Sequence, residues 1–219
     1  MKISILMLTY NAPLYVKKSV DSLRKKTKNI DYELIVVDNA SKPLTKWILN
    51  CLKRQNKIDK LHFNEKNFLF AKGNNIASKF CSEDSDLILL LNSDVKIKAD
   101  NWLEKLVAIH PKDGGISAYG AVLSEPVRAD GYCLLIDKKL YEKYLLDENF
   151  AWWWSVTKLE SLVLKENKEI IAVKNHEKYI HHYGGKSGKG FKNAAGMGIN
   201  IEEVKKWFES KRVTILDTI

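Results

Sequence analysis

Four groups of polar residues follow apolar runs in the first half of this sequence, and their side chains suit the binding of a charged ligand. The groups are Thr9-Tyr10-Asn11, Asp38-Asn39-Ala40-Ser41, Asn64–Asn67 and Asn92-Ser93-Asp94. Any single group could be a plain turn, because Asn, Asp and Ser favour turns whatever the function. A carboxylate at Asp38 can accept the hydrogen of a nucleobase imide, and one at Asp94 can hold a divalent cation against a diphosphate. Together the four groups predict a ligand site.

The apolar runs before these groups have the length of strands and alternate with helical patterns. The expected strands are Ile3–Leu8, Tyr32–Val37, Leu61–Phe63 and Leu87–Leu91. Helices are expected from Pro13, from Pro43 and over Phe70–Phe80. The run Leu87–Leu91 is apolar throughout, which is typical of a parallel sheet covered by helices on both faces. This order predicts a Rossmann-like unit, in which ligands bind beyond the carboxyl ends of the strands.

The helix that begins near Pro43 is expected to use Ser41 as its cap and to bury Trp47, Cys51 and Leu52. The second half of the chain has a more mixed pattern. We expect helices at Asp100–Ile109, Lys138–Leu145, Ser155–Glu166 and Ile201–Ser210, and strands at Gly115–Leu123, Gly131–Ile136 and Ile170–Val173. No repeat and no linker interrupts the pattern, so residues 1–219 are predicted to form a single domain.

Composition narrows the classes of partner. The 36 Lys and Arg against 27 Asp and Glu give a net charge of +9, which predicts an anionic partner. The basic residues are spread along the chain and form no nucleic-acid-binding module, so nucleic acid is not expected. Cys51, Cys81 and Cys133 lack the spacing of a zinc or redox site, which favours reduced thiols and a cytoplasmic location. No apolar run approaches the roughly 20 residues of a membrane helix, but the basic charge suits peripheral association with a membrane surface.

Four ordered motifs carry a resemblance to a known family: SILMLTYN at Ser4–Asn11, YELIVVDNAS at Tyr32–Ser41, NFLFAKGNN at Asn67–Asn75 and LLLNSDV at Leu89–Val95. In order and spacing they resemble family 2 glycosyltransferases, especially the branch that includes many rhamnosyltransferases. The resemblance implies an α/β fold of the GT-A type, with a Rossmann-like nucleotide-binding half and a mixed central β-sheet flanked by helices. Residues 1–98 would then bind the nucleotide sugar, and residues 99–219 would form the acceptor side.

The resemblance also implies roles for individual residues. Asp94 stands at the metal-binding position of the family's D-x-D motif, whereas the first position of that motif is the neutral Asn92. A Mn²⁺ or Mg²⁺ ion bridged by donor phosphates would need few protein ligands. The family often has Gly where Leu69 stands. The implied nucleotide-sugar contacts are Thr9, Tyr10, Asn11, Asp38, Asn39, Ser41, Asn67, Lys72, Asn75, Asn92, Ser93 and Lys186.

A downstream histidine commonly completes the metal or diphosphate site in this family. His181 and His182 precede Gly184-Gly185-Lys186-Ser187 in the corresponding region, with His182 the first choice and His181 the alternative. Lys186 would neutralise the leaving diphosphate. The Gly-Lys-Ser sequence resembles the end of a P-loop, but Ile180 stands where that motif requires glycine.

The expected catalytic base is missing from its usual place. The family has an acidic stretch that opens a helix after an aromatic run, and this chain has Ser155, Val156 and Lys158 at the acidic positions. A carboxylate is needed because a neutral alcohol is a poor nucleophile. The replacement candidates are Asp130, Asp147, Glu148 and Glu160.

Three adjacent tryptophans cannot all point inward from one face of a helix or strand. Trp153 and Trp154 are therefore candidates to stack on a sugar ring.

The resemblance predicts an inverting, metal-assisted transfer of a hexose or deoxyhexose, such as rhamnose, glucose or galactose. The donor would be a UDP- or dTDP-sugar, and the acceptor a hydroxyl of a glycan or lipid-linked glycan. The alternative is a nucleotide-sugar-binding protein of the same fold that no longer catalyses.

Overall fold

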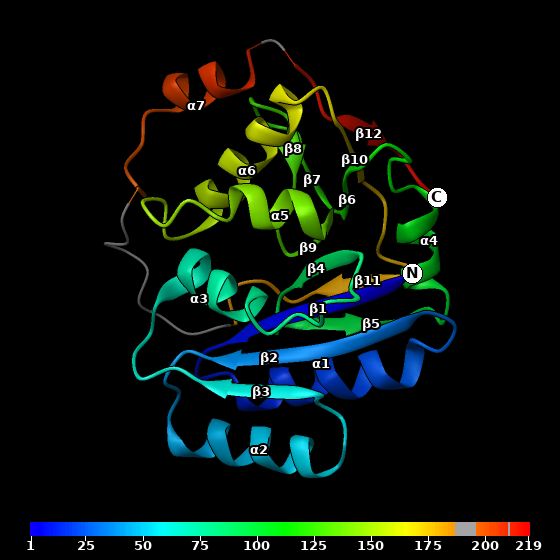
Figure 1. Ribbon diagram of the computed structural model, residues 1–219, viewed down its shortest axis with the longest axis vertical. Helices are drawn as coiled ribbons and strands as arrows, with labels where there is room; N and C mark the ends of the chain where they lie inside the picture. Colours follow the sequence, from blue (N-terminus) through cyan, green and yellow to red (C-terminus); the bar gives the residue numbers. More distant parts are fainter. Residues whose placement is uncertain (187–195, 210) are drawn as a thin grey trace.

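The computed structural model describes residues 1–186, 196–209 and 211–219. In these residues a central sheet has the strand order β12-β10-β6-β9-β4-β1-β2-β3 (Figure 1). Its strands are β1 (Lys2–Thr9), β2 (Asp31–Asp38), β3 (Lys60–Phe63), β4 (Leu87–Leu91), β6 (Gly115–Tyr119), β9 (Cys133–Asp137), β10 (Glu169–Val173) and β12 (Thr214–Leu216). β9 runs antiparallel to β4 and β6, and the other pairs are parallel. The predicted mixed sheet is confirmed.

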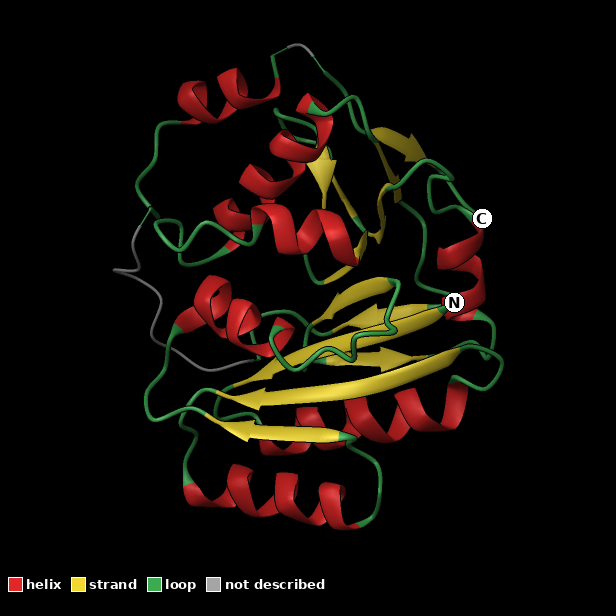
Figure 2. Cartoon of the chain, viewed as in Figure 1, coloured by secondary structure: helices red, strands yellow, loops and turns green. Residues whose placement is uncertain are grey.

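Helices cover both faces of the sheet, as Figure 2 shows. They are α1 (Pro13–Lys26), α2 (Pro43–Arg54), α3 (Leu69–Ser78), α4 (Trp102–Ala108), α5 (Lys138–Tyr144), α6 (Trp153–Lys165) and α7 (Ile201–Phe208). Successive side chains of β1 point to opposite faces, so Ile5 packs in the cluster with α1, α2 and α4, whereas Leu6 packs with α3, α5, α6 and α7. The all-apolar strand β4 divides its side chains in the same way, which explains why it contains no polar residue.

Two short pairings lie outside the central sheet. β5 (Val95–Ile97) pairs antiparallel with β11 (Ile180–His182), and β7 (Ala121–Val122) pairs with β8 (Arg128–Ala129). The strand expected over Gly115–Leu123 is therefore interrupted. Gly120, at φ +95°, separates β6 from β7, and its Cα lies so close to Tyr132 and Asp130 that a Cβ would clash with both.

The prediction for α2 is wrong in two respects. Trp47 is 63% exposed and Cys51 is half-buried, whereas Leu52 is buried as predicted, together with Thr45, Ile48 and Leu49. The N-cap is Lys42 rather than Ser41, and no side chain caps the helix. The Ser41 hydroxyl accepts a hydrogen bond from the Asn11 amide instead, so it joins two loops. Among the described residues, no helix combines the length and apolar character needed to cross a bilayer.

Hydrogen bonds around the buried carboxylate of Glu33 join the start of β2 to the loop after α3. Glu33 is 6% exposed and accepts hydrogen bonds from the Ser4 hydroxyl (2.6 Å) and the Ser82 amide (2.7 Å), and it forms an ion pair with Lys60 (2.7 Å). Burial raises the pKa of Glu33, but the bonds from Lys60, Ser4 and Ser82 outweigh it and lower the pKa to about 2.

We expect this network to stabilise the fold in a pH-dependent way. Because the folded pKa lies below the unfolded value near 4.5, the stabilisation is complete above about pH 4.5 and is lost as the pH falls toward 2. The shift corresponds to about 3 kcal/mol at about 1.4 kcal/mol per pKa unit. Urea melts should show Glu33→Gln to be less stable by about that amount at pH 7, with the difference shrinking at pH 3. Glu83→Gln, an exposed control on the adjacent loop, should melt like the wild type at both pH values.

Candidate functional site

The carboxyl ends of β1, β2 and β3 bring three of the polar groups together. Thr9 is aligned with Asp38, and Asp38 with Phe63, in the parallel ladder. Backbone bonds continue this alignment past the strands, because the Asn39 amide donates to the Thr9 carbonyl (2.9 Å) and the Asn64 amide to the Asp38 carbonyl (2.8 Å). The Asn64 side chain also donates to Asn39 Oδ1 (2.8 Å). We call this set of strand ends the base crevice.

The loops of the base crevice are tied to one another through strained backbone. Asn11, Ala40 and Leu69 have φ values of +50°, +57° and +62°, a region that non-glycine residues occupy at a cost of about 1–2 kcal/mol each. Asn11 Oδ1 accepts from the Lys42 amide (2.7 Å), and the Leu69 carbonyl accepts from Asn39 Nδ2 (3.2 Å). The positive φ at Leu69 explains why glycine suits this position.

Four of the eight buried side-chain oxygens without a hydrogen-bond partner among the described residues lie at or just after the ends of β1, β2 and β4. Among the described residues, Thr9 Oγ1, Asp38 Oδ1, Ser93 Oγ and Asp94 Oδ1 are buried and form no hydrogen bond. Leaving such atoms unpaired costs roughly 1–3 kcal/mol each, so their clustering indicates a ligand rather than a structural need. Burial raises the pKa of Asp38, an effect that its bond from the Ser41 amide (2.9 Å) opposes only in part.

The fourth strand end meets a histidine that arrives from far along the chain. The β5–β11 register aligns His182 with Val95, the residue after Asp94. His182 Nε2 lies 3.2 Å from Asp94 Oδ1, at ion-pair distance but without hydrogen-bond geometry, and Asn92 Nδ2 lies 3.4 Å from the same nitrogen. Asp94 Oδ2 accepts from the Lys186 amide (3.1 Å). Burial acts to raise the pKa of Asp94, but His182 and the Lys186 amide hold it below the usual value.

The two histidines of β11 point to different partners because neighbouring residues of a strand face opposite sides. The imidazole of His182 stacks on the ring of Tyr132, with centroids 4.3 Å apart and planes at 13°. His181 is directed instead to Glu177, with Nδ1 3.1 Å from Oε2, and its ring meets Tyr183 edge-on. The structure therefore brings His182, and not His181, to Asp94.

Asp94 and His182 form a donor set that fits a divalent cation. A carboxylate oxygen suits Mn²⁺ or Mg²⁺ and an imidazole nitrogen suits transition metals, and here Asp94 Oδ1 and His182 Nε2 lie 3.2 Å apart. Among the described residues, no group of three or more His, Cys, Asp or Glu side chains gathers as a metal site. The protein could thus supply two ligands, and the remaining positions would belong to the diphosphate and water.

A cavity of ≈ 300 Å³ opens beside this pair. Its lining residues are Phe70, Asn92, Asp94, Asp130, Gly131, Tyr132, Trp152, Trp153, Val156, His182 and Gly185. Asp130 is the only carboxylate other than Asp94 among these described lining residues. Of the two indoles expected to stack on a sugar, Trp153 lines the cavity, whereas Trp154 packs on the core beneath Arg128, whose guanidinium lies 5.2 Å from its ring centroid.

The other three candidate bases lie outside this cavity. Asp147 Oδ1 accepts from the amide and side chain of Asn149, which closes a local turn. Glu148 forms an ion pair with Lys72 (3.5 Å). Glu160 is fully buried, its Oε2 accepts from the Ala129 amide (2.9 Å), and burial raises its pKa to about 8. Of the four candidates, Asp130 is the one that lines the same cavity as Asp94 and His182.

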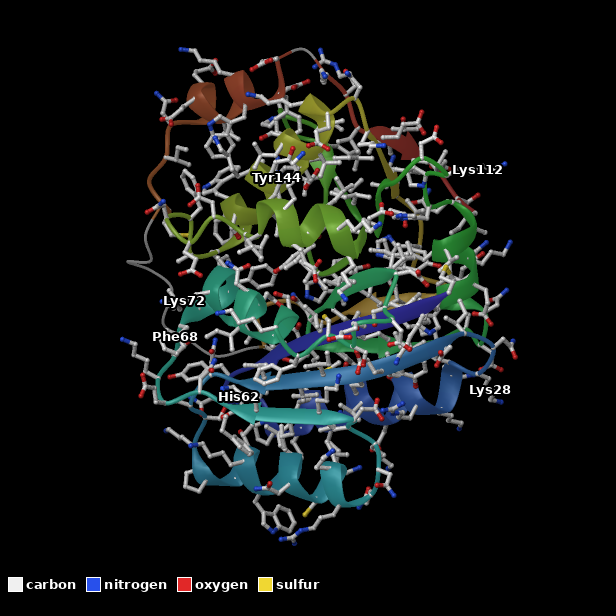
Figure 3. All side chains as sticks on the ribbon, viewed as in Figure 1. Lys28, His62, Phe68, Lys72, Lys112 and Tyr144 are labelled. Carbon is white, nitrogen blue, oxygen red and sulfur yellow. The ribbon has the colours of Figure 1, made fainter. Side chains whose placement is uncertain are left out.

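Several residues that were predicted to contact the nucleotide-sugar donor form hydrogen bonds or ring contacts within the protein. Asn75 forms four hydrogen bonds within the protein, because its amide donates to Leu146 and Glu148 and its oxygen accepts from Tyr141 and Leu146. Its contact with the donor stays a prediction. Asn67 Oδ1 accepts from the Leu69 amide. Lys72 lies over the Phe68 ring (5.2 Å) near the carboxyl ends of β1–β3 (Figure 3). Tyr10 follows Thr9 at the end of β1, and the Lys186 amide donates to Asp94 after β4, while Ser187 lies outside the described residues.

Sequence reasoning missed three aromatic residues of the cavity: Phe70, Tyr132 and Trp152. The signals were present but ambiguous. Trp152 was one of three adjacent indoles, and only the start of α6 at Trp153 decides which of them face the cavity. Tyr132 belongs to a strand-like run with no polar neighbour except Asp130, so its stacking on His182 could not be inferred without the β5–β11 pairing.

A sequence model described as Glycosyl transferase family 2 matches residues 4–146. No curated protein matches the chain by sequence. Among solved structures, the chain is similar to the mannosyltransferase PcManGT from Pyrobaculum calidifontis in complex with GDP-Man and Mn²⁺. The TM-score is 0.62 at 14% identity, over 74% of this chain and 52% of that one.

Two further structures show the same fold. S. aureus TarS 1-349 in complex with UDP has a TM-score of 0.57 at 20% identity, over 74% of this chain and 55% of that one. GalNAc-T7 with UDP, GalNAc and Mn²⁺ has a TM-score of 0.61 at 16% identity, over 74% and 40%. The chain spans about half the length of these proteins. Their likeness confirms the predicted GT-A fold.

The burial of Glu160 leads to a test of its role. Because its folded pKa of about 8 lies above the unfolded value of 4.5, the free energy of unfolding should fall as the pH rises from 4.5 to 8, by at most about 5 kcal/mol. Glu160→Gln keeps an acceptor for the Ala129 amide and should remove this decline, so the variant should be at least as stable as wild type at pH 8. Denaturant melts across this range would measure it; a variant that is less stable at every pH would contradict the buried-acid interpretation.

Proposed function

The chain belongs to glycosyl transferase family 2, and from this premise we propose that it transfers a hexose or deoxyhexose from a nucleotide diphosphate sugar to an acceptor hydroxyl. The observation that carries the proposal is the set of unpartnered buried oxygens at Thr9, Asp38, Ser93 and Asp94, which line up along the strand ends. The inverting outcome and a glycan or lipid-linked glycan acceptor are parts of the same proposal. The rhamnosyltransferase-like branch stays a prediction.

We assign the nucleobase to the base crevice. Asp38 Oδ1 and Thr9 Oγ1 can accept hydrogens from the ring, which suits the imide of uracil or thymine and so a UDP- or dTDP-sugar. A guanine ring also offers N–H donors to a carboxylate, and PcManGT holds GDP-Man. Binding measurements should therefore include UDP, dTDP and GDP.

The diphosphate and the sugar would lie between Asp94 and the cavity. A divalent cation held by Asp94 and His182 would supply positive charge to the diphosphate, as would Lys186. Trp153 would stack on the sugar or acceptor ring. Asp130 would accept the proton of the acceptor hydroxyl. At the same time, the oxygen of that hydroxyl would form a bond to the anomeric carbon of the donor sugar. The bond from that carbon to the diphosphate breaks at the same time, and its electron pair leaves with the diphosphate.

Replacement of Asp130 tests the assignment of the base. Asp130→Asn should lower kcat by at least about a hundredfold, because general base catalysis contributes 10²–10⁴-fold, while the Kd for the donor stays unchanged. Asp147→Asn and Glu148→Gln are matched controls outside the cavity and should retain activity. Release of the corresponding nucleoside diphosphate from a panel of UDP-, dTDP- and GDP-sugars would serve as the assay. Wild-type protein that binds donors and releases no diphosphate from any of them would support the inactive binding protein instead.

The two histidines offer a matched test of the metal site. Asp94→Asn and His182→Ala should each weaken Mn²⁺ binding at least about tenfold, since each removes one of two protein ligands. His181→Ala should bind Mn²⁺ like the wild type because its ring faces Glu177. Titration of the Mn²⁺ electron paramagnetic resonance signal with UDP present measures the affinity directly. Equal loss in both histidine variants would contradict the assignment to His182.

A further inference from the structure

Three of the exposed large apolar side chains belong to α1 and α2. Leu44 and Trp47 of α2 are 59% and 63% exposed, and Leu14 in the first turn of α1 is 65% exposed. Leu44 and Trp47 are three residues apart, so they share one helix face, and Arg54 lies on that face two turns beyond Trp47. The opposite face, with Ile48 and Leu49, packs on the sheet. We call Leu44, Trp47 and Arg54, with Lys42 just before the helix, the α2 outer face.

The surroundings of this face are strongly basic. Residues 42–57 contain no Asp or Glu, and their basic residues are Lys42, Lys46, Lys53, Arg54 and Lys57. Asp21, the one acidic residue of α1, is already neutralised by Lys17 and Lys57 at 2.5 and 2.6 Å. An exposed indole and leucine among cations, with no acidic residue on the same helix, match the interface of an anionic bilayer in both hydrophobicity and charge.

The size of the face favours a membrane over a protein partner. α2 has 12 residues and is therefore about 18 Å long, too short for its exposed stripe to supply the roughly 800 Å² that each partner buries in a stable protein interface. A bilayer needs only a few inserted side chains, because headgroup charge adds to the attraction. α2 also lies at one end of the long axis of the molecule, at the bottom of Figure 1, where a flat surface can reach it.

From these observations we propose that the α2 outer face docks the protein on a membrane that contains anionic lipid. The face is connected directly to the base crevice, since Lys42 follows Ser41 and its amide donates to Asn11 Oδ1. α1 and α2 also begin at the same edge of the sheet, after β1 and β2. Docking would hold this edge of the sheet near the headgroups, where a lipid-linked hydroxyl is found. The docking itself does not depend on the proposed sugar transfer.

Vesicle co-sedimentation without nucleotide tests the proposal. We expect binding to vesicles of phosphatidylcholine mixed with phosphatidylglycerol, weak binding to phosphatidylcholine alone, and loss of binding at high salt. The double variant Leu44→Ser/Trp47→Ser should bind at least about tenfold more weakly. Lys42→Gln should lower the partition coefficient about fivefold. Leu123→Ser, which removes a leucine of 52% exposure outside α1 and α2, is the matched control and should bind like the wild type.

Trp47 also provides a direct optical signal. Its emission should shift to the blue with anionic vesicles, and Trp47→Phe should lose that shift while keeping a wild-type melting curve. Absence of binding to anionic vesicles, or equal binding by the double variant, would overturn the proposal. It would also be overturned if the double variant abolished self-association in sedimentation velocity, because the face would then join two copies of the chain. The rate of donor hydrolysis by the double variant in solution should equal that of the wild type. This measurement separates a loss of membrane docking from a failure of the proposed sugar transfer.

Discussion

The parallel alignment of β1 with β2 is the constraint on which the rest of the site depends. It sets Thr9 level with Asp38, and the backbone bond from Asn39 to Thr9 extends that alignment into the loops. A shift of the β1–β2 pairing by one residue would move Asp38 to the other face of the sheet. The apolar side chains that now pack against α1 would then face α3, and the reverse. The same alternating burial that stabilises the core therefore fixes which polar atoms reach the crevice. The β1–β2 register therefore determines both the packing of the core and the positions of the polar atoms in the crevice.

The second requirement is the accommodation of a buried carboxylate. Asp94 is 1% exposed, and an ionised group so placed needs nearby positive charge or hydrogen bonds. Both come from residues about 90 positions away: the β5–β11 pairing delivers His182, and the loop after it delivers the Lys186 amide. Tyr132 then fixes the plane of the His182 ring by stacking. Asp94 comes from the first half of the chain, and His182 and Lys186 come from the second. Both halves are therefore needed to form this part of the site.

Sequence reasoning could predict β1–β4, β6, β9 and β10, the mixed sheet and the polar strand ends, because each depends on local pattern or on motif order. It did not predict β5, β11 and β12, each of which has only three residues. It failed where the answer depended on which way an element faces. Trp47 looked like core because it is large and apolar, yet helical phase places Ile48 and Leu49 against the sheet instead. The motif around Asn75 likewise did not indicate that its side chain bonds to α5 and to the loop after it. The choice among four carboxylates also needed tertiary structure, since only Asp130 shares a cavity with Asp94.

The replacement of a second carboxylate by Asn92 has a consequence for how this site would work. With Asp94 as the single anionic protein ligand, the pocket carries less negative charge than one with two carboxylates, so it attracts a free cation weakly and repels a diphosphate less. Affinity for the cation would then come largely from the nucleotide, and the two would enter together. His182 would add a nitrogen ligand, and Asn92 Nδ2 lies 3.4 Å from its Nε2. The +9 net charge acts in the same direction, because it favours the anionic complex over the bare cation. In the proposed site, an amide at this position would therefore make cation affinity depend more on the nucleotide and less on the protein, while Asp94 and His182 could still hold the ion.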